Sequence, residues 1–126
     1  MDKTYLVLIV LAVLTVKHTI FDFFLQSLSQ ISNKRIYGHR DGLLHAGGHA
    51  AGTCLAFVVM PPPIAVGIGI VLAEFALHYH IDWLKEKINY IRKFRPDQKI
   101  FWLAVGIDQW LHQMTYVGIT FVLAAA

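Results

Sequence analysis

Four long apolar stretches follow one another along the chain, with short polar segments between them. A helix that crosses a bilayer needs about 20 mostly apolar residues, and the stretches at residues 4–28, 43–60, 64–84 and 100–125 suit that length. Pro61, Pro62 and Pro63 cannot continue a helix, so they predict a tight turn between the second and third stretches. The pattern predicts an all-α integral membrane four-helix bundle, formed by a single domain over residues 1–126.

Small residues in the second stretch indicate close helix packing. Gly48 and Gly52 are four residues apart, a spacing that lets a neighbouring helix approach closely. Lys17 interrupts the apolar run of the first stretch. This favours a retained N-terminal helix over a cleaved signal peptide.

Composition excludes other classes of protein. The 126 residues are 56% apolar and 15% charged, whereas a soluble domain is about 45–50% apolar and about 25% charged. A single cysteine excludes a disulfide scaffold. We expect the lipid bilayer to be the main partner, and we expect no nucleic-acid partner.

Basic residues are concentrated in two of the connecting segments. Nine of the eleven Lys and Arg residues lie between the first and second stretches or between the third and fourth. The Pro turn and the C-terminal segment carry none. Because basic loops stay on the cytoplasmic side, we expect a multi-pass protein of the cell inner membrane with both termini outside.

Each apolar stretch carries one pair of possible metal ligands four residues apart. Residues at this spacing share one face of a helix, so the four pairs can converge inside a bundle. A hydrogen bond within one helix would explain a single pair, but ionisable residues inside a membrane are costly and mark functional sites by default. Four pairs on four helices therefore favour a metal site in the cytoplasmic half. The predicted ligands are His18, Asp22, His45, His49, His78, Asp82, Asp108 and His112.

The predicted ligands suit two divalent metal ions. Five neutral imidazoles and three carboxylates carry three negative charges, which two divalent ions and a bridging hydroxide would balance. Nitrogen and oxygen ligands without thiolate favour Zn, Fe or Mn. The ligand spacing also repeats, because His18 and His78 are 60 residues apart and His49 and His112 are 63 apart. This repeat predicts two helical hairpins related by a pseudo-two-fold axis.

Glu74 lies on the same helical face as His78 and Asp82, but deeper in the predicted span. We expect it to be a catalytic general acid or base, or a further metal ligand. The alternative is a protonated glutamic acid that bonds to a neighbouring helix. Glutamines flank the ligand pairs and are candidates to orient the imidazoles; they are Gln26, which lies nearest to its pair by helical spacing, Gln109 and Gln113.

The segment Lys85–Lys99 combines basic residues with apolar residues at roughly helical spacing, as in an interfacial amphipathic helix. One interpretation is that it attracts an anionic lipid or a phosphate-bearing amphipathic substrate to the cytoplasmic surface. The other is that it only sets the topology.

The motifs together resemble the bacterial and phage membrane proteins of the domain-of-unknown-function 3307 family. The resemblance covers nearly the whole chain. It implies a small membrane protein and supports the choice of residues, but it implies no particular reaction. The motifs are His18 with "DFFLQ" from Asp22 to Gln26, His45 with His49, "HIDWLK" around Asp82, and Asp-Gln-x-x-His from Asp108 to His112.

These features favour a membrane-embedded dinuclear metalloenzyme that acts on an amphipathic substrate at the cytoplasmic leaflet. A hydrolase is the leading interpretation and a di-iron oxidoreductase the next. Two alternatives stay open: a transporter or sensor of divalent metal ions, and a structural metal-binding subunit of a larger membrane complex. A homo-oligomer is compatible with each of them.

Overall fold

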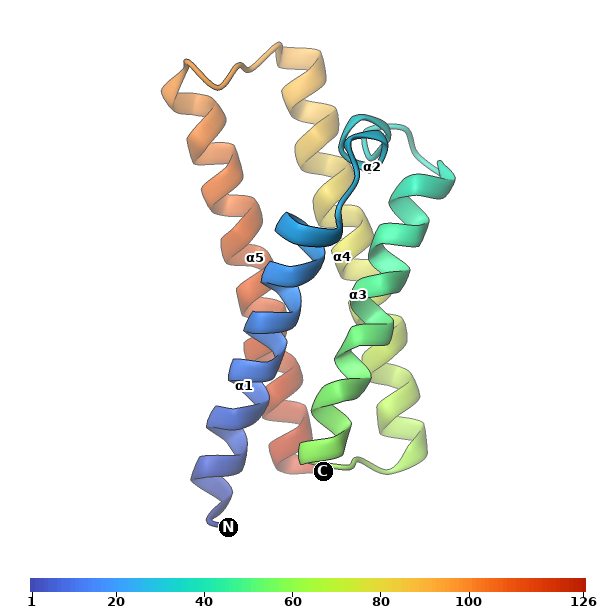
Figure 1. Cartoon of the computed structure of the whole chain (residues 1–126), viewed down its shortest axis with the longest axis vertical. Helices are drawn as coiled ribbons and strands as arrows, with labels where there is room; N and C mark the ends of the chain where they lie inside the picture. The colour runs from blue at the N-terminus through green and yellow to red at the C-terminus, as the bar shows by residue number, and fades with distance from the viewer.

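Helices form the whole structured part of the chain, as the apolar pattern predicts. The structure is a computed structural model that describes residues 1–126 and contains no strands. The long helices lie side by side, and α1 and α4 each contact both α3 and α5 (Figure 1). The elements are α1 (Lys3–Thr19), the π-helix η1 (Ile20–Leu25), α2 (Leu28–Asn33), α3 (Arg40–Val59), α4 (Ile64–Arg92) and α5 (Lys99–Ala125).

The connections divide between the two ends of the molecule. Both termini and the Pro-rich connection between α3 and α4 lie at one end, whereas α2 and the α4–α5 connection lie at the other (Figure 1). The two basic segments of the sequence are therefore at the same end. This arrangement is the one that the loop charges predict.

Three helical segments are long and apolar enough to cross a membrane: Lys3–Leu25, Arg40–Val59 and Ile64–Arg92. The predicted fourth span, α5, is not among them, since Asp108, Gln109, His112 and Gln113 interrupt its apolar run. Large apolar side chains cover the outside of the molecule, and the exposed fractions of Phe24 and Phe121 are 76% and 72%. An apolar surface of this extent is typical of contact with lipid or with a protein partner.

Several helix ends differ from the predicted ones, and α3 begins at Arg40 rather than at residue 43. The first helix ends at Leu25 rather than at residue 28, because the Ser27 side chain caps α2 and Gln30 completes a capping box with it. Helix α4 runs on to Arg92 and ends at Lys93, whose φ is 54°. The residues from Lys85 to Arg92 thus extend α4 instead of forming a separate interfacial helix.

The close helix approach expected at Gly48 and Gly52 is confirmed. A Cβ atom on Gly48 would lie 2.8 Å from the Phe21 ring, and one on Gly52 would lie 2.9 Å from Lys17 Cγ. Both neighbours belong to the continuous segment of α1 and η1. The two glycines therefore bring α3 against the helix that carries His18 and Asp22.

We predict that Gly52→Leu destabilises the protein and that Gly106→Leu does not. Both changes replace glycine within a helix, but a Cβ on Gly106 meets no atom within 4 Å. Overpacking at Gly52 should lower the free energy of unfolding by about 1–3 kcal/mol. Denaturant titration in detergent micelles measures both variants, and equal stabilities would contradict this account of the α1–α3 contact.

Candidate metal centre

The predicted ligands come together in the interior, where two groups have ligand atoms within 4.8 Å of one another. The first group is Asp22, His45, His49 and His78, and the second is His78, Asp82 and His112. We call these six residues the His/Asp centre. They come from η1, α3, α4 and α5, whereas α1 and α2 contribute none. Five of the six are buried, and Asp22 is partly buried.

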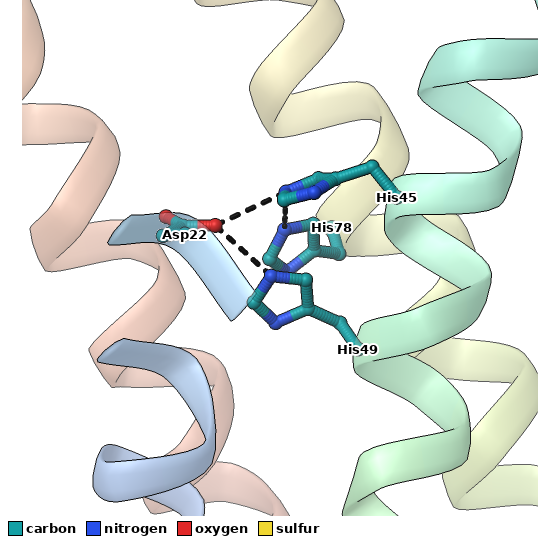
Figure 2. A group of neighbouring side chains, drawn as sticks. All are labelled: Asp22, His45, His49 and His78. Atoms are coloured by element: carbon teal, nitrogen blue, oxygen red, sulfur yellow. Dashed lines mark hydrogen bonds and ion pairs between the residues drawn. The ribbon is translucent and has the colours of Figure 1, made fainter. Parts of the chain in front are cut away.

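The first group is organised around one oxygen of Asp22. His45 Nε2 lies 3.0 Å and His49 Nε2 lies 2.9 Å from Asp22 Oδ1. His78 Nε2 lies 3.4 Å from His45 Nε2, so the three imidazoles point toward one another (Figure 2). Convergence of three ring nitrogens and a carboxylate on one small volume is a ligand set that suits a divalent metal ion.

The second group is organised around Asp82, whose two oxygens face different neighbours. Oδ1 lies 3.1 Å from His112 Nε2, while Oδ2 lies 3.4 Å from His78 Nε2. Oδ2 also lies 3.3 Å from His45 Nε2, which belongs to the first group. The Asp82 carboxylate therefore spans the two groups, the position that a carboxylate bridging two ions would occupy.

Two of the eight predicted ligands, His18 and Asp108, lie beside the groups and not within them. Both ring nitrogens of His18 have hydrogen-bond partners: Nδ1 is 2.8 Å from the Tyr116 hydroxyl and Nε2 is 2.9 Å from Gln109 Oε1. The Asp108 carboxylate is buried, and its Oδ1 has no hydrogen-bond partner.

Gln109 is the glutamine that organises the ligand pairs. Its amide nitrogen donates to Asp22 Oδ2 at 3.3 Å and to Asp108 Oδ2 at 3.2 Å. Gln26 instead donates to the backbone carbonyl of Asp22 at 3.1 Å. The expected advantage of Gln26 depended on regular α-helical spacing after Asp22, which the structure does not have.

Asp22 lies in the π-helix η1, Ile20–Leu25. The wider turn of a π-helix shifts side chains relative to α-helical spacing, and such segments occur often at functional sites. Here the carboxylate faces His45 and His49 of α3 and also stays 3.2 Å from His18 Nε2. The irregular segment thus presents Asp22 to both its own helix and α3.

The segment that connects α2 to α3 adds a cation to the His/Asp centre. Lys34 Nζ lies 2.7 Å from Asp82 Oδ2, and the side chain is buried. Its ammonium offsets part of the negative charge of the carboxylates. In the sequence, Lys34 is one of the basic residues that predict the topology, and nothing in a short polar segment indicates that a lysine turns inward.

The family model of a protein of unknown function, DUF3307, matches residues 10–126. The chain belongs to this family. The matched residues include all the members of the His/Asp centre. Neither the curated proteins nor the solved structures contain a match. The family assignment confirms the predicted resemblance and leaves the function to be argued from the site.

Glu74 lies in a second buried group, next to the His/Asp centre. Its Oε1 is 2.5 Å from Lys17 Nζ, and its Oε2 accepts a hydrogen bond from the Thr53 hydroxyl. Lys17 also donates to the backbone carbonyl of His49 at 3.1 Å and lies 3.4 Å from the Tyr116 hydroxyl. Glu74 therefore reaches the imidazole of His18 only through Lys17 and Tyr116.

Like Lys34, Lys17 and Tyr116 belong to the site but were not among the predicted site residues. A lysine in one apolar stretch and a glutamic acid in another are a detectable signal, since buried charges in proteins are paired. Tyr116 lies four residues after His112 and so shares its helical face. No sequence pattern predicts that its side chain is almost fully buried, with an exposed fraction of 1%.

We predict that Lys17→Met and Glu74→Met are each strongly destabilising but that the double variant recovers stability. Each single change leaves one charged group buried without its partner, at a cost of about 3–5 kcal/mol. Replacing both members removes the charges together. Denaturant titration of the four proteins in detergent gives the coupling free energy, and additive losses would contradict the ion pair.

Proposed function

We propose that this protein is a membrane-embedded metal-dependent hydrolase with two divalent ions, Zn, Fe or Mn, in the His/Asp centre. Its substrate is amphipathic and presents a phosphoester or another ester group at the cytoplasmic leaflet. The observation that carries the proposal is the pair of adjoining ligand groups spanned by Asp82. Two-metal sites with ions about 3.5–4 Å apart are common among phosphoester hydrolases.

The donor set supports two ions better than one. Asp22, His45 and His49 can serve one ion, while His78, Asp82 and His112 can serve the other. Each set has nitrogen and oxygen donors only and leaves coordination positions for water or substrate, as catalytic sites require. Buried carboxylates favour cations strongly, because isolated charges are costly in a low-dielectric interior.

The contacts also support the proposed four-helix bundle of two related hairpins. His18 to Asp22 is 3.2 Å and His78 to Asp82 is 3.4 Å, as expected for equivalent pairs. Across each hairpin, His49 to Asp22 is 2.9 Å and His112 to Asp82 is 3.1 Å. We propose that the basic end of this bundle faces the cytoplasm and that both termini lie outside.

The side chains beyond the Lys17–Glu74 pair favour an enzyme over a transporter. The buried residues toward the termini are mostly apolar, and they include Val10, Leu14, Ile70, Ile119 and Leu123. An ion released from the His/Asp centre would meet no continuous row of polar ligands in that direction. A chemical step on a substrate that enters from one leaflet needs no such row.

The chemistry assigned to the site follows from these residues. Divalent ions held in the His/Asp centre would supply Lewis-acid chemistry, which activates water for attack on an ester near neutral pH. Asp22 and Asp82 would hold the ions. His18 contacts Gln109, whose amide nitrogen donates to Asp22 and so helps to orient its carboxylate. We propose that Glu74 is a positioning residue, since Lys17 and Tyr116 separate it from the imidazole of His18.

We predict that protein purified in detergent without chelators carries about two divalent ions per chain. Element-resolved mass spectrometry measures the metal content, and release of product from a phosphodiester in mixed micelles measures turnover. His49→Ala and His112→Ala should each reduce the metal content by about one ion and abolish turnover, because each removes a ligand from one set.

His39→Asn is the matched control, since His39 caps α3 outside both ligand groups and asparagine is a good cap. This variant should keep its metal and its turnover. Metal-free wild-type protein that nevertheless hydrolyses the phosphodiester would overturn the assignment. Two bound ions without any hydrolysis would instead favour a structural or sensing role.

A further inference from the structure

An apolar groove runs between α4 and α5 at the end of the molecule that carries the basic segments. It has a volume of about 500 Å³, and nine of its twelve lining residues are hydrophobic. Ile81, Leu84 and Ile88 line it from α4, while Leu103 and Ile107 line it from α5. Both helices extend to this end of the molecule (Figure 1).

A second groove of about 720 Å³ continues along the same pair of helices toward the termini. The two grooves share Leu77, Ile81 and Leu111. Gly69 and Gly118 line the second groove, and a Cβ atom on either would meet nothing within 4 Å. At 1.5 Å per residue, the α4 wall from Val66 to Ile88 is roughly 33 Å long. An apolar furrow of this length, formed by the two grooves together, suits an extended hydrocarbon chain.

We call the groove at the basic end the upper groove and the one toward the termini the lower groove. The upper groove has a polar residue that connects it to the His/Asp centre. Asp108 lines the groove, is only 4% exposed, and has an oxygen without a hydrogen-bond partner. His112, a member of the centre, lies one turn further along α5, with its Nε2 3.6 Å from that oxygen. A molecule in the groove therefore lies next to the ligands of the centre.

The charge around the groove favours an anionic head group. Lys85 lines the groove beside Asp108, and its Nζ is 2.5 Å from Glu86 Oε1. Two divalent ions and one hydroxide would balance the carboxylates of Asp22, Asp82 and Asp108. The ammonium of Lys34, 2.7 Å from Asp82 Oδ2, would then remain as an excess positive charge at the centre. A phosphate group would offset it.

We propose that the α4–α5 furrow binds one acyl chain of an anionic phospholipid and places its phosphate between Lys85 and the His/Asp centre. The inference rests on the proposed function, to which it adds the substrate class and the route of entry. The lipid enters sideways from the cytoplasmic leaflet, and its head group reaches the centre past Asp108. Lys85 would exchange its Glu86 partner for the phosphate, and this makes it a specificity-determining residue for the negative charge.

The test is lipid binding by native mass spectrometry of the full chain in detergent, with dioleoyl phosphatidylglycerol or dioleoyl phosphatidylcholine added. Wild-type protein should retain one phosphatidylglycerol per chain. Ala104→Trp fills the upper groove and should weaken binding by at least about tenfold. Gly106→Trp is the matched control, because Gly106 lies two residues away on α5 in open space outside both grooves. It should bind lipid as the wild type does.

Two further variants keep the test decisive. Gly118→Trp fills the lower groove from a position with no neighbour within 4 Å, so it should fold and also lose the lipid. Lys85→Gln should bind both lipids equally. Equal retention of phosphatidylglycerol by Ala104→Trp, Gly118→Trp and wild type would overturn the proposal. So would a chain dimer that the two tryptophan variants abolish without any bound lipid.

The same samples separate this proposal from the proposed function. Lipid retention that depends on the groove, in a protein that binds metal but hydrolyses nothing, would reject the hydrolase and keep the lipid site. Metal-dependent hydrolysis of a soluble phosphodiester, unchanged in Ala104→Trp and without lipid retention, would keep the hydrolase and reject the lipid site.

Discussion

The burial of Asp22 and Asp82 among imidazoles is the constraint on which the rest of the molecule depends. Their oxygens lie within 3.4 Å of ring nitrogens from α1, α3, α4 and α5. Carboxylates in an apolar interior need compensating charge and hydrogen bonds, or their desolvation would oppose folding. The four long helices must therefore pack closely around these carboxylates. The glycines of α3 allow the close approach of α1, and the π-helix directs Asp22 toward α3.

Two neighbouring features support the centre in different ways. The Lys17–Glu74 pair lies on the side of the termini, and it contacts the centre through the backbone carbonyl of His49. Tyr116 connects Lys17 to His18, which lies beside the centre. On the other side, Lys34 contacts Asp82 of the centre, and the apolar α4–α5 groove lies beside it. A site closed at one end and adjacent to a lateral groove suits a substrate that arrives within the plane of a membrane.

The sequence predicted the helices and most members of the two groups that could hold a metal ion, because both depend on local spacing. Pairs four residues apart share a helical face, and six of the eight predicted residues do lie within the two ligand groups. The rest depends on contacts between distant segments. The π-helix that redirects Asp22, the inward turn of Lys34 and the pairing of Lys17 with Glu74 come from tertiary packing, which no local pattern encodes. For the same reason the carboxylates of Asp22 and Asp108 are contacted by Gln109 and not by Gln26, the glutamine that helical spacing favoured.

X-ray absorption fine structure of the metal-loaded protein tests the central claim most directly, because it reads the ligands and the distance between ions without a crystal. We expect a first shell of nitrogen and oxygen only, the outer-shell scattering of imidazole rings, and a second ion at about 3.5–4 Å. A sulfur ligand, or a metal without imidazole scattering, would contradict the His/Asp centre. Imidazole scattering with no neighbouring ion in fully loaded protein would contradict its two-metal form.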